Sequence, residues 1–222
     1  MAMQAAASEQ LTEIQIEVYA PERSLLVASL LSMSGGFLDA FTWMSLGVFA
    51  SSQTGNVVFL GVYALSGQWQ RALHHLLPLA AFVLGAVVAV YTRAQLRCLA
   101  GETACLAVAM LLLHRVPDQM TILVISFGVA LQSASFRQVG RWNYLSVTVT
   151  GNMLRAIDQL VATSDRDAAH GARVMLLLCL MFLVGAAVGG CVTRWLGPWS
   201  LVLPIASSVS VLWLCRHPGE PH

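Results

Sequence analysis

One tripeptide, Thr-Gly-Asn, occurs twice in this chain, and both copies carry side chains that could hold a polar ligand. The residues are Thr54, Gly55, Asn56, Thr150, Gly151 and Asn152. Threonine and asparagine can cap the free N–H groups at a helix start, and glycine allows a sharp bend before it. A helix start carries about half a positive charge and can bind an anion or a polar oxygen atom. Two such starts could form a substrate site, or each triplet could serve only a tight turn whose polar groups are satisfied internally.

We expect Asp39 to be the only acidic residue well inside a clean apolar run. An uncompensated carboxylate in a membrane core costs at least about 3 kcal/mol, so Asp39 should face protein or water rather than lipid. It could couple transport to a proton or cation, or contact a cationic or polar substrate. The structural alternative is a partner such as Asn56, Asn152 or Arg155.

Arg155 and Asp158 lie three residues apart, which places them on one face of a helix. We therefore predict an ion pair that compensates the cost of burying two charged side chains on a partly buried helix. Arg137 and Arg141 are four residues apart, and we interpret them as markers of the cytoplasmic edge rather than ligands for a substrate anion.

Metal, cofactor and enzyme sites are not predicted. We interpret His74 and His75 as solvated interface residues, and the five cysteines are not spaced as zinc or redox ligands. No serine-hydrolase, metalloprotease or phosphate-binding motif occurs. All 12 basic residues are arginine, and the absence of lysine excludes a P-loop ATPase and a Schiff-base mechanism.

The composition is that of a membrane protein. Of the 222 residues, 57% are hydrophobic and 10% are charged, whereas a soluble domain carries about 25% charged residues. This excludes an ordinary soluble enzyme, and the net charge of +1 suggests no nucleic-acid partner. We predict an all-α, polytopic transmembrane helical bundle whose partner is the lipid bilayer.

Six apolar runs are predicted to cross the membrane, and two further segments are ambiguous. The six are 24–46, 75–92, 100–114, 119–136, 172–194 and 198–215, and the ambiguous segments are 48–66 and 144–163. If all eight cross, the arginines divide 7 to 5 between the two sides. If the two ambiguous segments are broken or re-entrant helices, the division is 9 to 3, as the positive-inside rule expects. We therefore predict six full spans with both termini cytoplasmic.

The chain is predicted to contain an internal repeat. The two triplets are 96 positions apart, and the segment 82–86 matches the segment 182–186. The resulting division has four parts: a cytoplasmic N-terminal tail, 1–23, two membrane repeats, 24–116 and 117–215, and a C-terminal tail, 216–222. The N-terminal tail has no signal peptide and is expected to form a short helix that is either interfacial or frayed. Three spans in each half would invert one repeat relative to the other, as in many secondary transporters.

Small residues recur at helical spacing and predict close helix packing. They are Ala28, Ser32, Gly36, Ala40, Gly85, Gly185 and Gly189. Packing between the halves is favoured over a dimer face, although a homodimer stays open.

The pattern of these motifs resembles the YoaK family of bacterial membrane proteins, whose function is uncharacterised. The residues that carry the resemblance are Gly36, Asp39, Ala40, Gly128, Gln132 and both Thr-Gly-Asn triplets, within residues 24–215. The resemblance implies the fold and a bacterial inner-membrane location but no substrate. In the family the residue after the matching glutamine is often asparagine, whereas here it is Ser133, which weakens the second half's share of any polar site.

The leading hypothesis is a small secondary transporter or permease-like protein for a small polar solute. Its site would comprise Asp39, Gln132 and the two triplets, with Asp39 and Asn56 facing a shared hydrated cavity. The alternative is a non-transporting membrane scaffold or accessory subunit. An intramembrane enzyme is least favoured because no catalytic motif occurs.

Overall fold

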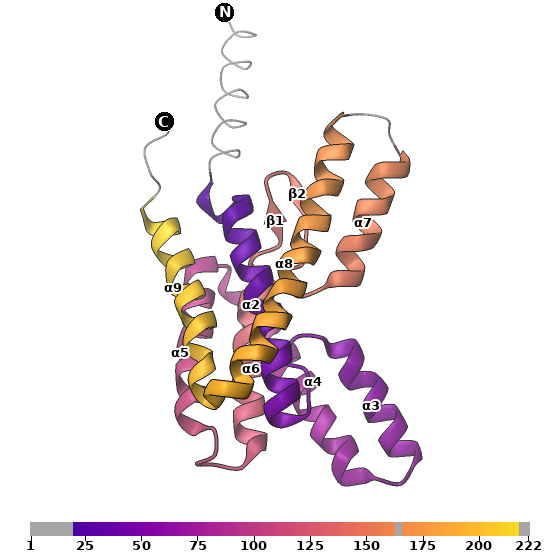
Figure 1. Ribbon diagram of the computed structural model, residues 1–222, viewed down its shortest axis with the longest axis vertical. Coiled ribbons are helices and arrows are strands. Elements are labelled where there is room, and N and C mark those ends of the chain that lie inside the picture. The colour runs from indigo at the N-terminus through magenta and orange to yellow at the C-terminus, as the bar shows by residue number, and fades with distance from the viewer. Residues whose placement is uncertain (1–19, 163–165, 218–222) are drawn as a thin grey trace, which may run out of the picture.

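Helices account for nearly all of the regular structure in the computed structural model, which describes residues 20–162 and 166–217 (Figure 1). The predicted all-α class is confirmed. The helices are η1 (Pro21–Arg23), α2 (Leu25–Leu46), α3 (Gln53–Leu65), α4 (Trp69–Thr92), α5 (Gln95–Leu112), α6 (Asp118–Ser135), α7 (Val149–Ala162), α8 (Arg166–Leu196), η2 (Gly197–Leu201) and α9 (Val202–Arg216). Two short strands, β1 (Gln138–Val139) and β2 (Trp142–Asn143), form a hairpin after α6. The interfacial helix expected within residues 1–23 lies outside the described residues, apart from η1.

The helices α3 and α7 are the shortest α-helices in the described chain, and α9, with 15 residues, continues directly from η2. The helices α3 and α7 contain 13 and 14 residues, so each is about 20 Å long, whereas the hydrocarbon core is about 30 Å thick. Four helical stretches are long and apolar enough to cross a membrane, namely Leu25–Leu46, Trp69–Thr92, Gln95–Leu112 and Asp167–Arg216, the last comprising α8, η2 and α9. The two ambiguous segments of the sequence are thus the two short helices.

Helices from the two halves of the chain pack against each other in matching pairs. Helix α2 packs along α8 and α4 packs along α6, while the short helices α3 and α7 pack on α4 and α8. Figure 1 shows α3 and α7 on the same side of the bundle. Both helices begin near the middle of the bundle, and from there α3 runs toward the lower end of the view and α7 toward the upper end. The start of α2 and the end of α9 lie at one end of the bundle (Figure 1).

Local signals explain where α2 begins and ends. The Oγ atom of Ser24 accepts a hydrogen bond from the Val27 N–H group at 3.2 Å, as an N-cap residue does. Gly47 follows the helix with φ = +69°, a left-handed conformation that glycine adopts without steric cost. The chain can therefore turn back at once and enter the loop that precedes α3.

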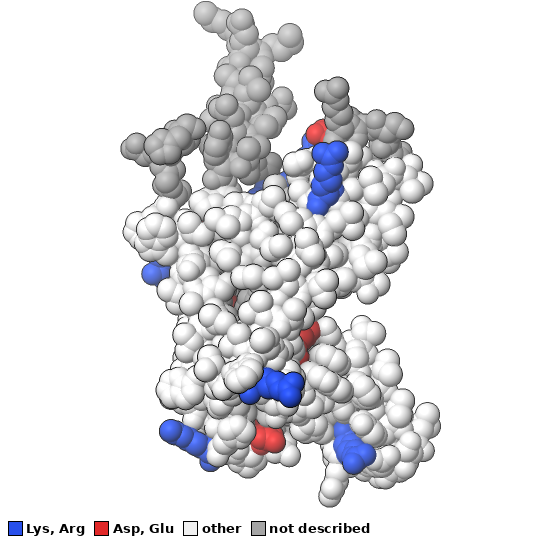
Figure 2. All heavy atoms as spheres, in the orientation of Figure 1, with Lys and Arg blue, Asp and Glu red and all other residues white. Residues whose placement is uncertain are grey.

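The core and the surface are both apolar. The largest buried cluster joins α2, α5, α6 and the segment before α3, and includes Phe41, Leu106 and Ile125. On the face drawn in Figure 2, uncharged atoms cover nearly the whole surface, and the charged side chains are few and scattered. Exposed leucine, valine and tryptophan side chains are numerous, as expected where lipid rather than water is the neighbour.

Candidate functional site

Asn56 fixes the loop that precedes α3. Its Oδ1 atom accepts a hydrogen bond from the Phe49 N–H group at 3.1 Å, and its Nδ2 atom donates to the Phe49 carbonyl oxygen at 2.7 Å. The Nδ2 atom also donates to the Gln53 side-chain oxygen at 2.9 Å. The amide therefore pairs with both polar groups of one loop residue, as a neighbouring strand would.

Asn152 makes the same pair of hydrogen bonds before α7. Its Oδ1 atom accepts from the Leu145 N–H group at 3.2 Å, and its Nδ2 atom donates to the Leu145 carbonyl oxygen at 2.8 Å. In both loops the clamped residue lies seven positions before the asparagine. The two asparagines thus hold loops rather than cap helix N–H groups, because their amides find a complete peptide group to pair with.

Asp39, on α2, holds the first loop, which is the segment between α2 and α3. Its carboxylate accepts hydrogen bonds from the N–H groups of Ser51 and Ser52, at 2.7 and 3.3 Å, and from both serine hydroxyl groups, the Ser51 hydroxyl at 2.7 Å. The side chain is 5% exposed. Four donors occupy the lone pairs of the two carboxylate oxygens and compensate the burial of the charge. The partners of Asp39 are therefore two serines and not Asn56, Asn152 or Arg155.

Gln132 occupies the comparable position on α6 with weaker contacts. Its Nε2 atom donates to the Leu31 carbonyl oxygen at 3.5 Å and to the Ser146 hydroxyl oxygen at 3.4 Å. Its Oε1 atom is buried and has no hydrogen-bond partner in the described part of the chain. The second loop is therefore held mainly by Asn152.

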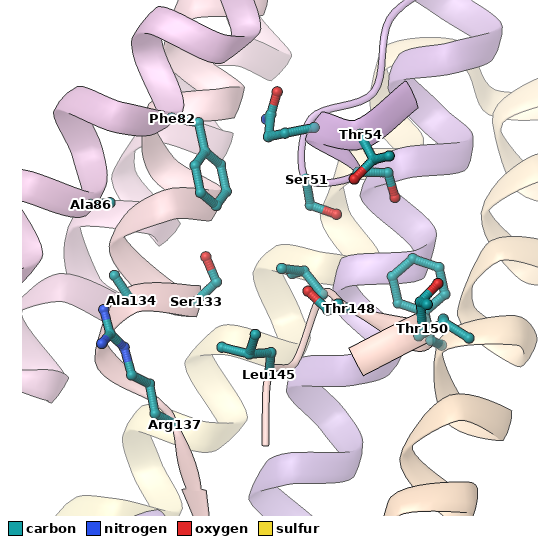
Figure 3. Close-up of a pocket in the computed structure, with 15 residues that line it drawn as sticks. Ser51, Thr54, Phe82, Ala86, Ser133, Ala134, Arg137, Leu145, Thr148 and Thr150 are labelled. Atoms are coloured by element: carbon teal, nitrogen blue, oxygen red, sulfur yellow. The ribbon is translucent and has the colours of Figure 1, made fainter. Parts of the chain in front are cut away.

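A cavity of about 430 Å³ lies between the two loops and the starts of α3 and α7 (Figure 3). Its wall is formed by Ser51, Ser52, Gln53, Thr54, Phe82, Ala86, Ser133, Ala134, Arg137, Leu145, Val147, Thr148, Val149, Thr150 and Phe182. Figure 3 shows Thr54 above Thr150 on the right of the view, each at the start of its short helix. Ligand pockets commonly measure about 300–1,000 Å³, so the cavity has room for a small solute.

Only part of the predicted site reaches this cavity. Thr54 and Thr150 line it, although they are far apart in the sequence. The other six predicted residues, Asp39, Gly55, Asn56, Gln132, Gly151 and Asn152, are not among its lining residues. Sequence reasoning missed the hydroxyl groups of Ser51, Ser52 and Thr148, whose only signal was their position just before the two triplets.

The ion pair expected between Arg155 and Asp158 is not present in the described residues, and the expectation is corrected. Asp158 is exposed, and Arg155 instead donates a hydrogen bond to the Asn152 Oδ1 atom at 3.3 Å. Helical side chains lean toward the N-terminus, so Arg155 reaches the residue three positions earlier. This contact adds a third hydrogen bond to the Asn152 side chain.

His75 corrects a second expectation, because it is buried rather than solvated. The side chain is 4% exposed and stacks on Phe59 and Tyr63, with ring centroids 5.0 and 5.6 Å apart. Its Nδ1 atom lies 3.4 Å from the Asn56 Oδ1 atom. His74 contacts the Leu46 carbonyl oxygen at 2.7 Å. Both histidines therefore help to hold α3 and the end of α2 against α4, and no cluster of metal ligands occurs in the described chain.

Four of the predicted small residues are glycines at which two helix backbones meet, and Ala40 is half-buried on α2. Ala28, Ser32 and Gly36 are buried on α2. A Cβ atom added at Gly36 would collide with the Phe182 carbonyl oxygen of α8, and one at Gly185 with the Met33 carbonyl oxygen of α2. At Gly189 and Gly85 the added atom would lie 2.7 Å and 2.5 Å from the carbonyl oxygens of Phe37 and Phe127. The backbones of the two halves thus meet within one chain.

Glu102 is a buried acid that the amino-acid pattern did not bring out. It lies on α5 with no exposed surface, its Oε2 atom accepts a hydrogen bond from the Ser208 hydroxyl at 3.1 Å, and its Oε1 atom has no partner in the described residues. The signal was present, because Glu102 falls inside the predicted run 100–114. Asp39 is therefore not the only acid inside an apolar segment.

Together these features define a helical membrane protein in which two short helices begin beside a cavity lined by both polar and apolar side chains. The family model described as "Protein of unknown function (DUF1275)" matches residues 27–214, so the chain belongs to this family. The YoaK proteins form a DUF1275 membrane protein family, and the resemblance noted in the sequence is confirmed. Comparisons with curated proteins and with solved structures found no match to the chain.

Proposed function

We propose that this protein is a small secondary transporter, or permease, for a small polar solute. The observation that carries the proposal is the cavity between the starts of α3 and α7 (Figure 3). In many transporters, interrupted or short helices end beside the substrate, because their free polar groups can replace the water around it.

The proposed topology has six full spans, with α3 and α7 as re-entrant helices. Helices of 13 and 14 residues are too short to cross the hydrocarbon core, and the 9 to 3 arginine division favours both termini in the cytoplasm of a bacterial inner membrane. The matched clamps of Asn56 and Asn152 support two related halves. Three spans in each half make these halves inverted repeats, which supports alternating access to a site between them.

The side chains around the cavity take two roles in this proposal. Thr54, Thr150, Ser51 and Ser52 offer hydroxyl groups to the solute. Asp39, Asn56, Gln132 and Asn152 are positioning residues that hold the loops on which these hydroxyl groups stand. Transport is driven by a solute or ion gradient, since the chain has no phosphate-binding motif for ATP.

Blocking the cavity tests the proposal. Ala86 lines the cavity, whereas the neighbouring Val87 is 45% exposed on the outer surface of α4. Purified protein in liposomes would be assayed for uptake of labelled glycine, glycolate and ethanolamine. We expect uptake of at least one solute above that of empty liposomes, lost in Ala86→Trp and kept in Val87→Trp.

A second measurement does not depend on the choice of solute. In a variant without the native cysteines, Thr150→Cys should react with a membrane-impermeant maleimide, and Ala156→Cys, at a buried position of the same helix, should not. An unreactive Thr150→Cys would show that water does not enter the cavity, and the transporter proposal would then be abandoned.

A further inference from the structure

One charged side chain, Arg137, lines the cavity in the described structure. It follows the end of α6, and its backbone carbonyl oxygen accepts a hydrogen bond from the Tyr144 N–H group at 2.9 Å, which fixes its position at the base of the hairpin. Its guanidinium group has no hydrogen-bond or ion-pair partner within the described residues. Arg141, by contrast, pairs with Asp167 and lies over the Trp142 ring. Arg137 is thus an exposed cation at the cavity whose donors are available to a ligand, and this replaces its interpretation from the sequence as a marker of the cytoplasmic edge alone.

Three serine hydroxyl groups that line the cavity, unlike Arg137, can only accept hydrogen bonds from a ligand. The protons of Ser51 and Ser52 are donated to the Asp39 carboxylate, and that of Ser133 to the Val129 carbonyl oxygen at 2.8 Å. A hydroxyl group has one proton, so these oxygens can only accept hydrogen bonds from a ligand. The buried Asp39 charge behind two of them favours a donor or a positive group at that side.

The cavity is therefore polarised. Figure 3 places Arg137 at one side and Ser51 and Thr54 at the other. We propose that the solute is a small organic anion that also carries a hydrogen-bond donor, an inference that rests on the proposed transport site. Its carboxylate pairs with Arg137, whose planar guanidinium matches a carboxylate with two parallel hydrogen bonds, and its hydroxyl or amino group donates to Ser51 and Ser52. Thr148 and Thr150 also line the cavity, and their hydroxyl groups can donate or accept.

Thermal unfolding of the purified protein in an uncharged detergent tests this chemistry without any transport assay. Circular dichroism would follow unfolding in sodium glycolate, sodium acetate and ethanolamine chloride, each against sodium chloride of equal ionic strength. At ten times its Kd, glycolate is expected to raise the unfolding midpoint by about 3 °C. Acetate, which lacks the donor, should give a smaller shift, and ethanolamine, which lacks the carboxylate, should give none.

Arginine variants then locate the carboxylate. Arg137→Gln is expected to weaken glycolate binding about tenfold or more, because a charged hydrogen-bond pair is lost. Arg97→Gln removes an exposed arginine outside the cavity lining and should leave the glycolate shift unchanged. Arg137→Lys keeps the charge and should keep part of the shift, which provides a second variant if Arg137→Gln does not fold.

Every other result overturns the anion assignment. A shift with ethanolamine equal to that with glycolate, or a full glycolate shift in Arg137→Gln, would show that Arg137 does not select the ligand. No shift with glycolate in the wild-type protein would indicate that Arg137 serves another anion, such as a lipid phosphate. These outcomes leave the proposed transport site in place, whereas a full glycolate shift in Ala86→Trp would place binding outside the cavity and count against both proposals.

Discussion

The loops before α3 and α7 share one backbone device but differ in how their charges are arranged. Each is clamped by an asparagine that pairs with both polar groups of a residue seven positions earlier. The first loop is also anchored by four hydrogen bonds to Asp39, whereas Gln132 gives the second loop one long contact to Ser146. The second loop lies instead beside Arg137, which has no side-chain partner in the described part of the chain. The two loops therefore share their backbone geometry and differ in charge: the first is held around a buried carboxylate, and the second lies beside an arginine side chain that has no partner in the described residues.

Removing the Asp39 carboxylate, which holds the first loop only, should lower the free energy of unfolding more than any other change proposed here. Asp39→Ala leaves the two buried donors of Ser51 and the two half-buried donors of Ser52 without their acceptor, and we expect the free energy of unfolding to fall by about 4 kcal/mol. Asp39→Asn keeps the size and part of the acceptor capacity and should cost less. Unfolding in mixed micelles, followed by circular dichroism, measures both. A loss below about 1 kcal/mol in Asp39→Ala would show that the loop does not depend on this anchor.

Substitutions at the crossings of α2 with α8 and of α4 with α6 should have the next largest effect on the free energy of unfolding. Gly185→Ala drives a methyl group into the α2 backbone, and we expect a loss of about 3 kcal/mol in unfolding free energy. Gly85→Ala makes a shallower overlap with α6 and should cost about 2 kcal/mol. Gly61→Ala on α3 meets no atom within 4 Å and serves as the control. Equal stability of all three variants would rule out close packing at these crossings.

The two asparagine clamps should contribute similar amounts. Asn56→Ala and Asn152→Ala each leave the half-buried polar groups of one loop residue unpaired, and we expect each to lower the free energy of unfolding by about 2 kcal/mol. Hydrogen exchange of the Phe49 and Leu145 amides, detected by mass spectrometry, should speed up only in the variant that loses its own clamp. If either amide exchanges at the wild-type rate in that variant, the clamp does not protect it.

Gln132 should give the smallest effect. Gln132→Met keeps the side-chain volume and removes hydrogen bonds of 3.4–3.5 Å, so the unfolding free energy should change by less than about 1 kcal/mol. A loss as large as that of Asp39→Ala would make the two loops equivalent and would remove the asymmetry described above.

Elements were easier to predict from the sequence than contacts. The apolar runs predicted the long helices because burial in lipid requires continuous hydropathy, and the triplets marked the starts of α3 and α7. The partners of polar side chains depend on how a loop closes. Nothing in the spacing of Asp39, Ser51 and Ser52 shows that the carboxylate meets both serines. Glu102 was missed for another reason, because one acid barely lowers the hydropathy of a run whose other residues are apolar.

The span of each anchor along the chain has a consequence for biogenesis. Asp39 meets its partners only 12 and 13 residues later, so the first loop can close as soon as α2 and the start of α3 have been synthesised. Gln132 reaches the Leu31 carbonyl oxygen across 101 residues, and Gly185 meets α2 from still farther along the chain. Insertion can therefore complete one wall of the cavity early, while the opposite wall must wait until the ribosome has delivered α8.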